Sequence, residues 1–125
     1  MTKKSTQWFA VVGGAAVVLT VGCSSMKTPA TADVAVSKAA VENAAGAGGV
    51  EFAPAEMSSA REKLAQANQA MAAKDYKLAA DLANQAQADA KLAQGKANSA
   101  KAQAASDALQ EDIRVLREEL GRTSP

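Results

Sequence analysis

The sequence predicts an all-α protein: a short first helix, an antiparallel helical hairpin, and a long C-terminal helix that extends into a short coiled-coil-like tail. Apolar residues make up 48% of the 125 residues but aromatic residues only 3%, and alanine supplies most of the apolar share. Alanine has the highest helix propensity of all residues. Beyond the first 30 residues, apolar side chains recur at spacings of three and four, the period of one helix face. Glycine and proline residues divide this pattern into separate helices.

The first 25 residues have the composition of an export signal. Lys3 and Lys4 precede an apolar run from Trp8 to Val21, and small residues follow it. The run is 14 residues long, whereas a membrane-spanning helix needs about 20. We therefore expect residues 1–22 to be a signal peptide; a short membrane-anchoring helix is the alternative.

The only cysteine of the chain ends this signal, in the sequence Thr20-Val21-Gly22-Cys23. This segment resembles the lipobox of bacterial lipoproteins, which implies cleavage between Gly22 and Cys23. The resemblance further implies a diacylglyceryl thioether on the Cys23 sulfur and a palmitate-type acyl chain on the new N-terminus. The residue after the cysteine is Ser24 and not an aspartate. The resemblance therefore implies that the protein is sorted to the outer membrane, with the domain on its periplasmic face. The alternative is an ordinary signal peptide that ends beside a chance cysteine.

A tether and a first helix are expected next. Residues 23–30 contain polar residues and Pro29 without an apolar period, which is typical of a flexible tether. Residues 31–45 form the expected helix, with Thr31 as its N-cap and Asp33 at the positive end of the helix dipole. Three closely spaced glycines then break the helix: Gly46, Gly48 and Gly49.

The helical hairpin is expected to complete a domain over residues 31–105. Its first helix should begin at Pro54, because proline is tolerated at the first helical position. Lys74, Asp75 and Tyr76 form the expected turn, with Asp75 as the N-cap of the long helix. The predicted apolar faces are Met57, Ala60, Leu64, Ala67 and Met71 on one helix, and Leu78, Leu82, Ala83, Ala86, Ala90, Ala93 and Ala97 on the other.

Residues 106–125 form a tail of different character. Leu109, Ile113, Leu116 and Leu120 recur at spacings of four, three and four, which is a short heptad seam. A helix from Asp75 to Leu120 would be about 69 Å long, more than the hairpin can cover, and Gly121 is its expected C-cap. We expect the seam to project and to contact a second copy of the chain or another envelope protein. The alternatives are a seam folded back on its own chain and a frayed tail.

Several short segments occur in a fixed order along the predicted domain: Phe52-Ala53-Pro54-Ala55-Glu56-Met57, Ala60-Arg61-Glu62-Lys63-Leu64, Lys74-Asp75-Tyr76, and Leu82-Ala83 with Gln85-Ala86 and Asp89-Ala90. This ordered set resembles a bacterial envelope family known as domain of unknown function 4398, over about residues 31–105. The resemblance implies a short helical lipoprotein domain without an established activity. Some relatives resemble this chain followed by an OmpA-like peptidoglycan-binding domain. We do not expect that domain here, so peptidoglycan binding is left open.

The composition argues against several classes of function. The chain has no histidine and one cysteine, so neither the commonest general base nor a thiolate metal cluster is available. We expect no catalytic residues, no metal and no cofactor, and we interpret Asp81 and Asp89 as surface carboxylates. A formal net charge of +1 argues against nucleic-acid binding. The preferred function is a membrane-tethered structural or adaptor lipoprotein of the cell envelope that acts through helix–helix contacts. The alternative is a peptide- or ligand-binding groove near Tyr76.

Overall fold

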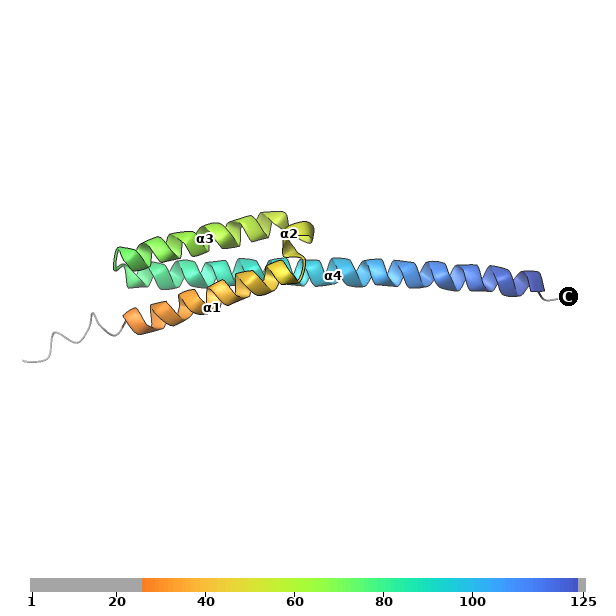
Figure 1. Cartoon of the computed structure of the whole chain (residues 1–125), viewed down its shortest axis with the longest axis horizontal. Helices are drawn as coiled ribbons and strands as arrows, with labels where there is room; N and C mark the ends of the chain where they lie inside the picture. Colours follow the sequence, from red (N-terminus) through yellow and green to blue (C-terminus); the bar gives the residue numbers. More distant parts are fainter. Residues whose placement is uncertain (1–25, 124–125) are drawn as a thin grey trace, which may run out of the picture.

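The computed structural model describes residues 26–123, which form four helices and no strand. The helices are α1 (Lys27–Gly46), α2 (Gly49–Phe52), α3 (Pro54–Ala72) and α4 (Tyr76–Thr123). Helices α1 and α3 lie along the first half of α4, and α4 then continues alone (Figure 1). Helix α1 runs parallel to α4 and α3 runs antiparallel to it (Figure 1). The predicted all-α fold, with a hairpin and a long C-terminal helix, is confirmed.

Helix α1 begins at Lys27, four residues before the predicted start at Thr31. The prediction of a tether over residues 23–30 is therefore wrong for its second half. Pro29 lies in the first turn, where a backbone N–H has no helical acceptor, so the proline is tolerated. The hydroxyl of Thr31 donates to the carbonyl oxygen of Lys27 at 2.8 Å, so this residue lies inside the helix and does not cap it.

The predicted break at the glycines is confirmed, and two of these residues are required by the turn. Helix α1 ends at Gly46, and Gly48 has a φ of +95°, in the left-handed region that favours glycine. A Cβ atom on Gly49 would lie 2.7 Å from the carbonyl oxygen of Ala44 and 2.9 Å from the Sδ of Met57. The four-residue helix α2, which the sequence analysis did not predict, begins at Gly49.

The predicted hairpin turn between α3 and α4 is confirmed, with Asp75 as the N-cap. The backbone N–H of Leu78 donates to Oδ1 of Asp75 at 3.1 Å. The N–H of Asp75 donates to the carbonyl of Ala70 at 2.9 Å, and the N–H of Lys74 to that of Met71 at 3.1 Å. Lys74 has a φ of +63°. This pair of hydrogen bonds around a left-handed residue is the Schellman motif, which satisfies the last carbonyls of a helix.

The core of the bundle is built from small side chains. Leu78, which we predicted in the core, is 47% exposed, and the buried stripe of α4 passes through Ala79 instead. Methyl groups let helices approach closely, so a leucine in this stripe would hold α1 and α3 away. Ala79 of α4 packs with Ala30 and Ala70, while Ala90 and Ala93 pack with Val41, Ala44, Met57 and Ala60. The fully buried alanines of α4 are Ala79, Ala83, Ala86, Ala90, Ala93 and Ala97.

Helix α4 is longer than predicted, because it passes through Gly121 and ends at Thr123. A glycine ends a helix by adopting a left-handed conformation. Among residues 26–123, Gly48 and Lys74 are the residues with positive φ, so Gly121 has a helical backbone and the predicted C-cap is wrong. Within the same range, no helix combines the length and the apolar character that a bilayer crossing requires.

Candidate functional site: the projecting end of α4

The last part of α4, residues 102–123, extends beyond the bundle (Figure 1) and is called the projecting segment here. Every side chain of this segment is exposed. The four predicted seam residues, Leu109, Ile113, Leu116 and Leu120, are between 38% and 67% exposed. The prediction that this seam projects beyond the hairpin is therefore confirmed, and the identity of its partner stays a prediction.

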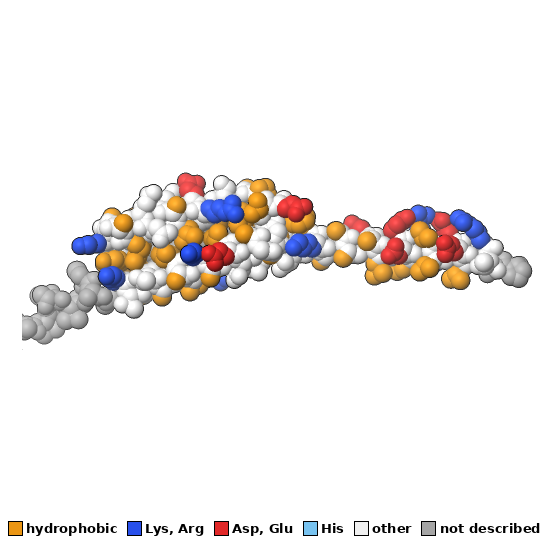
Figure 2. Space-filling model, in the orientation of Figure 1, with side chains coloured by type: hydrophobic (Ala, Val, Ile, Leu, Met, Phe, Trp, Pro, Cys, Tyr) orange, Lys and Arg blue, Asp and Glu red, His pale blue; other side chains and the backbone are white. Residues whose placement is uncertain are grey.

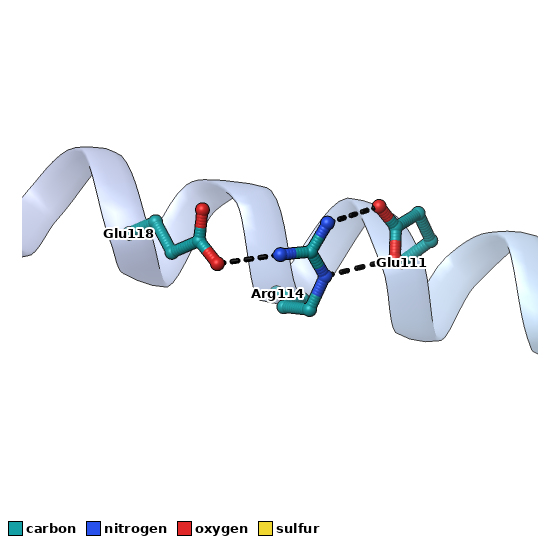
Figure 3. A network of polar contacts seen from close by, with 3 residues as sticks. All are labelled: Glu111, Arg114 and Glu118. Carbon is teal, nitrogen blue, oxygen red and sulfur yellow. Dashed lines mark hydrogen bonds and ion pairs between the residues drawn. The ribbon is translucent and has the colours of Figure 1, made fainter.

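Three charged side chains of the projecting segment, Glu111, Arg114 and Glu118, form a network of polar contacts (Figure 3). Arg114 donates from Nε and Nη2 to the two carboxylate oxygens of Glu111, at 2.9 and 2.5 Å, and from Nη1 to Glu118 at 2.5 Å. Arg114 lowers the pKa of Glu111, and the carboxylate of Glu111 raises the pKa of Arg114 in return. With 3.6 residues per turn, the network and the seam are centred about 160° apart around the helix axis. Figure 2 shows apolar and charged side chains on opposite sides, so the segment is amphipathic.

Asp81 and Asp89, which we interpreted as surface carboxylates, each have a separate partner. Asp89 accepts hydrogen bonds from the Ser59 hydroxyl and the Lys63 ammonium, both at 2.7 Å, and so joins α4 to α3. The hydrogen bond from Lys63 lowers the pKa of Asp89, and that from Ser59 acts in the same direction. Asp81 pairs with Lys77 at 3.1 Å within α4. The two carboxylates therefore have different partners. The described part of the chain holds no group of three acidic or cysteine side chains suited to a metal ion.

Tyr76, the centre of the alternative ligand-binding hypothesis, lies at the hairpin end of the bundle. Its ring is half-buried against a cluster formed by Ala30, Ala70 and Ala79. In this position the ring covers the end of the alanine core. The ligand-binding hypothesis stays a prediction. The lipidation site Cys23 and the cleavage position after Gly22 lie outside the described residues, so these also stay predictions.

Two groups of residues were missed by the sequence analysis. Lys96 of α4 pairs with Glu56 of α3 and lowers the pKa of that carboxyl group. Asp112 and Arg117 flank the seam, and neither side chain makes an ion pair or hydrogen bond with any residue in 26–123. The first pair depends on how α3 and α4 align. The second pair could have been found by assigning heptad positions to the seam.

The comparisons with known proteins bear on the bundle more than on the seam. A family model described as "Domain of unknown function (DUF4398)" matches residues 32–109. This region contains most of α1, the hairpin, and α4 up to Leu109, the first seam residue. No curated protein and no solved structure matches the chain. Because the matched region is more than half of the chain and agrees with the resemblance found in the sequence, the protein belongs to the DUF4398 family, a domain of unknown function.

Proposed function

We propose that the protein is a membrane-tethered structural or adaptor lipoprotein of the bacterial cell envelope, which acts through helix–helix contacts of the seam. The observation that carries this proposal is the exposure of large aliphatic side chains in line on a lone helix. Leu109, Ile113 and Leu116 are all exposed on the projecting segment. Full burial of one such side chain is worth about 1.5–3 kcal/mol. A second apolar helix face laid against the seam would therefore gain substantial hydrophobic free energy.

The position of the seam supports an adaptor role. Helix α1 and helix α4 both begin at the same end of the molecule, and the projecting segment lies at the other end (Figure 1). At 1.5 Å per residue, Leu109 lies about 50 Å and Leu120 about 66 Å along α4 from Tyr76. A lipid on Cys23, four residues before α1, would tether the bundle end to the outer membrane. The seam would then be the part of the protein farthest from that membrane.

Photo-crosslinking in cells tests the seam contact. A photoreactive residue is placed in the full-length chain at Gln110, which adjoins the seam, or at Gln66, which is exposed on α3. We expect an adduct from Gln110 that disappears in the variant Ile113→Asp. The matched control is Val115→Asp, since Val115 is 40% exposed and lies on the same helix away from the seam. That control should keep the adduct.

Two results would contradict the seam contact. An adduct from Gln110 that is equally strong in wild type and in Ile113→Asp would show that the seam does not make the contact. Adducts from Gln66 alone would place the contact on the bundle and favour the ligand- or peptide-binding alternative.

A separate experiment tests the anchor. Cells that express the wild type, Cys23→Ser or the neighbouring control Ser24→Ala are labelled with a palmitate analogue and fractionated. We expect the label and the membrane fraction to be lost only in Cys23→Ser. Loss of neither would overturn the lipid anchor and favour an ordinary signal peptide.

A further inference from the structure

We infer that the partner of the seam is a second copy of this chain, aligned parallel and in register; this inference rests on the proposed function, which gives the seam a helical partner. The spacing of the seam places Leu109 and Leu116 at heptad position d, and Ile113 and Leu120 at position a. A β-branched residue at a, combined with leucine at d, favours two-stranded parallel coiled coils. Leu109, Ile113 and Leu116 are all exposed on the projecting segment, so a second helix can reach them.

The charges that flank the seam match this arrangement. In the same numbering Asp112 is at position g and Arg117 is at position e, five residues later. Position g of one helix contacts position e of the next heptad on a parallel partner. Two copies would therefore form two symmetric ion pairs between Asp112 and Arg117. Within one helix the two side chains cannot pair, because helical neighbours are three or four residues apart, and neither is paired within residues 26–123.

The antiparallel arrangement has the opposite electrostatic result. Reversing one helix places positions g opposite each other, which brings Asp112 close to Glu119 of the second copy, twice in the dimer. Like charges at these positions are unfavourable, and such juxtapositions select against wrong partners. The charge pattern thus favours the parallel dimer over the antiparallel one.

The bundle leaves this face of α4 accessible. The fully buried alanines of α4, from Ala79 to Ala97, all occupy positions b and f of the seam numbering. Positions b and f lie on the outer side of a coiled coil, away from the partner helix. Leu78 and Leu92, which are at position a, are both about half-exposed within the bundle region. Helices α1 and α3 therefore cover one side of α4, and the second copy takes another, so the dimer forms without opening the bundle.

Charge reversal in differently tagged full-length copies, expressed together, tests the dimer by co-capture. Asp112→Lys in both copies, or Arg117→Glu in both copies, replaces two attractions by two repulsions. We expect about tenfold less co-capture for each, from the usual strength of exposed pairs. A mixture of one Asp112→Lys copy with one Arg117→Glu copy restores both attractions and should return to the wild-type level. The loss should shrink at high salt. The control Asp107→Lys reverses a charge at position b and should change co-capture less than twofold.

The outcomes separate this inference from the proposed function. Stronger co-capture in Asp112→Lys would indicate an antiparallel dimer, and a mixed pair that stays weak would exclude the paired charges; either result overturns the inference. Adducts from Gln110 to a different protein, lost in Ile113→Asp and without co-capture of a second copy, overturn the dimer but support the adaptor. If Ile113→Asp changes neither adduct nor co-capture, both proposals fail.

Discussion

The same substitution at two glycines should change stability in opposite directions. In Gly49→Ala the new Cβ would lie 2.7 Å from the backbone carbonyl oxygen of Ala44, which cannot rotate away. Overpacking of this kind costs about 1–3 kcal/mol. In Gly95→Ala the new Cβ meets no atom within 4 Å. Gly95 is exposed to solvent and lies well away from both ends of helix α4. Alanine is favoured there by about 1 kcal/mol. The free energies of unfolding of the two variants should therefore differ by about 2–4 kcal/mol.

Urea unfolding, followed by the helical circular dichroism signal, measures this difference. The dependence of the free energy on urea should be the same in wild type and both variants, so that the midpoints report stability. Gly49→Ala should unfold at lower urea than wild type, and Gly95→Ala at higher urea. If Gly49→Ala is as stable as wild type, the turn after α1 is not as closely packed as its distances indicate. If Gly95→Ala loses stability, the surface at that position is not open, and the reasoning from the two environments is refuted.

Three further variants test the buried polar and capping groups. Ser37→Ala should raise the free energy of unfolding by about 1–2 kcal/mol, because the buried Oγ of Ser37 has no hydrogen-bond partner among the described residues. The control Ser58→Ala, on the exposed side of α3, should raise it by only about 0.5 kcal/mol through helix propensity. A loss of stability in Ser37→Ala would contradict the argument. Lys63 lowers the pKa of Asp89, so this carboxylate stabilises the fold above about pH 4 and its contribution is lost as the pH falls through the lowered pKa. Urea midpoints measured from neutral to acidic pH should thus fall less steeply in Asp89→Asn, and parallel curves would disprove the link. Asp75→Ala removes the N-cap of α4 and should lower the thermal midpoint, at a cost of about 0.5–2 kcal/mol; an unchanged midpoint would show that the cap is dispensable.

The features that were predicted correctly depend on neighbours in the chain. Pro54 begins α3 and Asp75 caps α4, as expected, because these roles are determined within one helical turn. The start of α1 at Lys27 was missed for a related reason. Pro29 was interpreted as part of a tether, although a proline in the first turn costs no hydrogen bond. Gly121 was interpreted as a helix end, although a glycine that keeps helical dihedrals only weakens a helix.

The choice of buried face could not be predicted from hydrophobicity alone. Leu78 is half-exposed while its neighbour Ala79 is buried, although leucine is the more apolar residue. Two helices pack on α4, and the face between them accepts methyl groups because the helix axes are close. This preference arises from the way α1 and α3 pack on α4. The spacing of apolar residues within α4 alone does not show that arrangement.

The seam could be predicted from the sequence, whereas the contacts between helices could not. The seam was predicted, since it lies on one helix that no other element covers, so its spacing alone describes its surface. The contact between Lys63 and Asp89 joins residues 26 positions apart. It depends on the alignment of α3 against α4, and the sequence shows neither residue as a partner of the other.

Because α4 is one continuous helix, the direction in which the seam faces depends on the number of residues between the bundle and the seam. Bundle and seam share the single helix Tyr76–Thr123, with no hinge between Ala97 and Leu109. Each residue inserted or deleted in that interval would turn the seam by about 100° relative to α1 and α3. An insertion of seven residues would return the seam to nearly its original direction and move it about 10.5 Å outward. Insertions of heptad length can therefore change the reach of this protein, while shorter ones redirect its contact face.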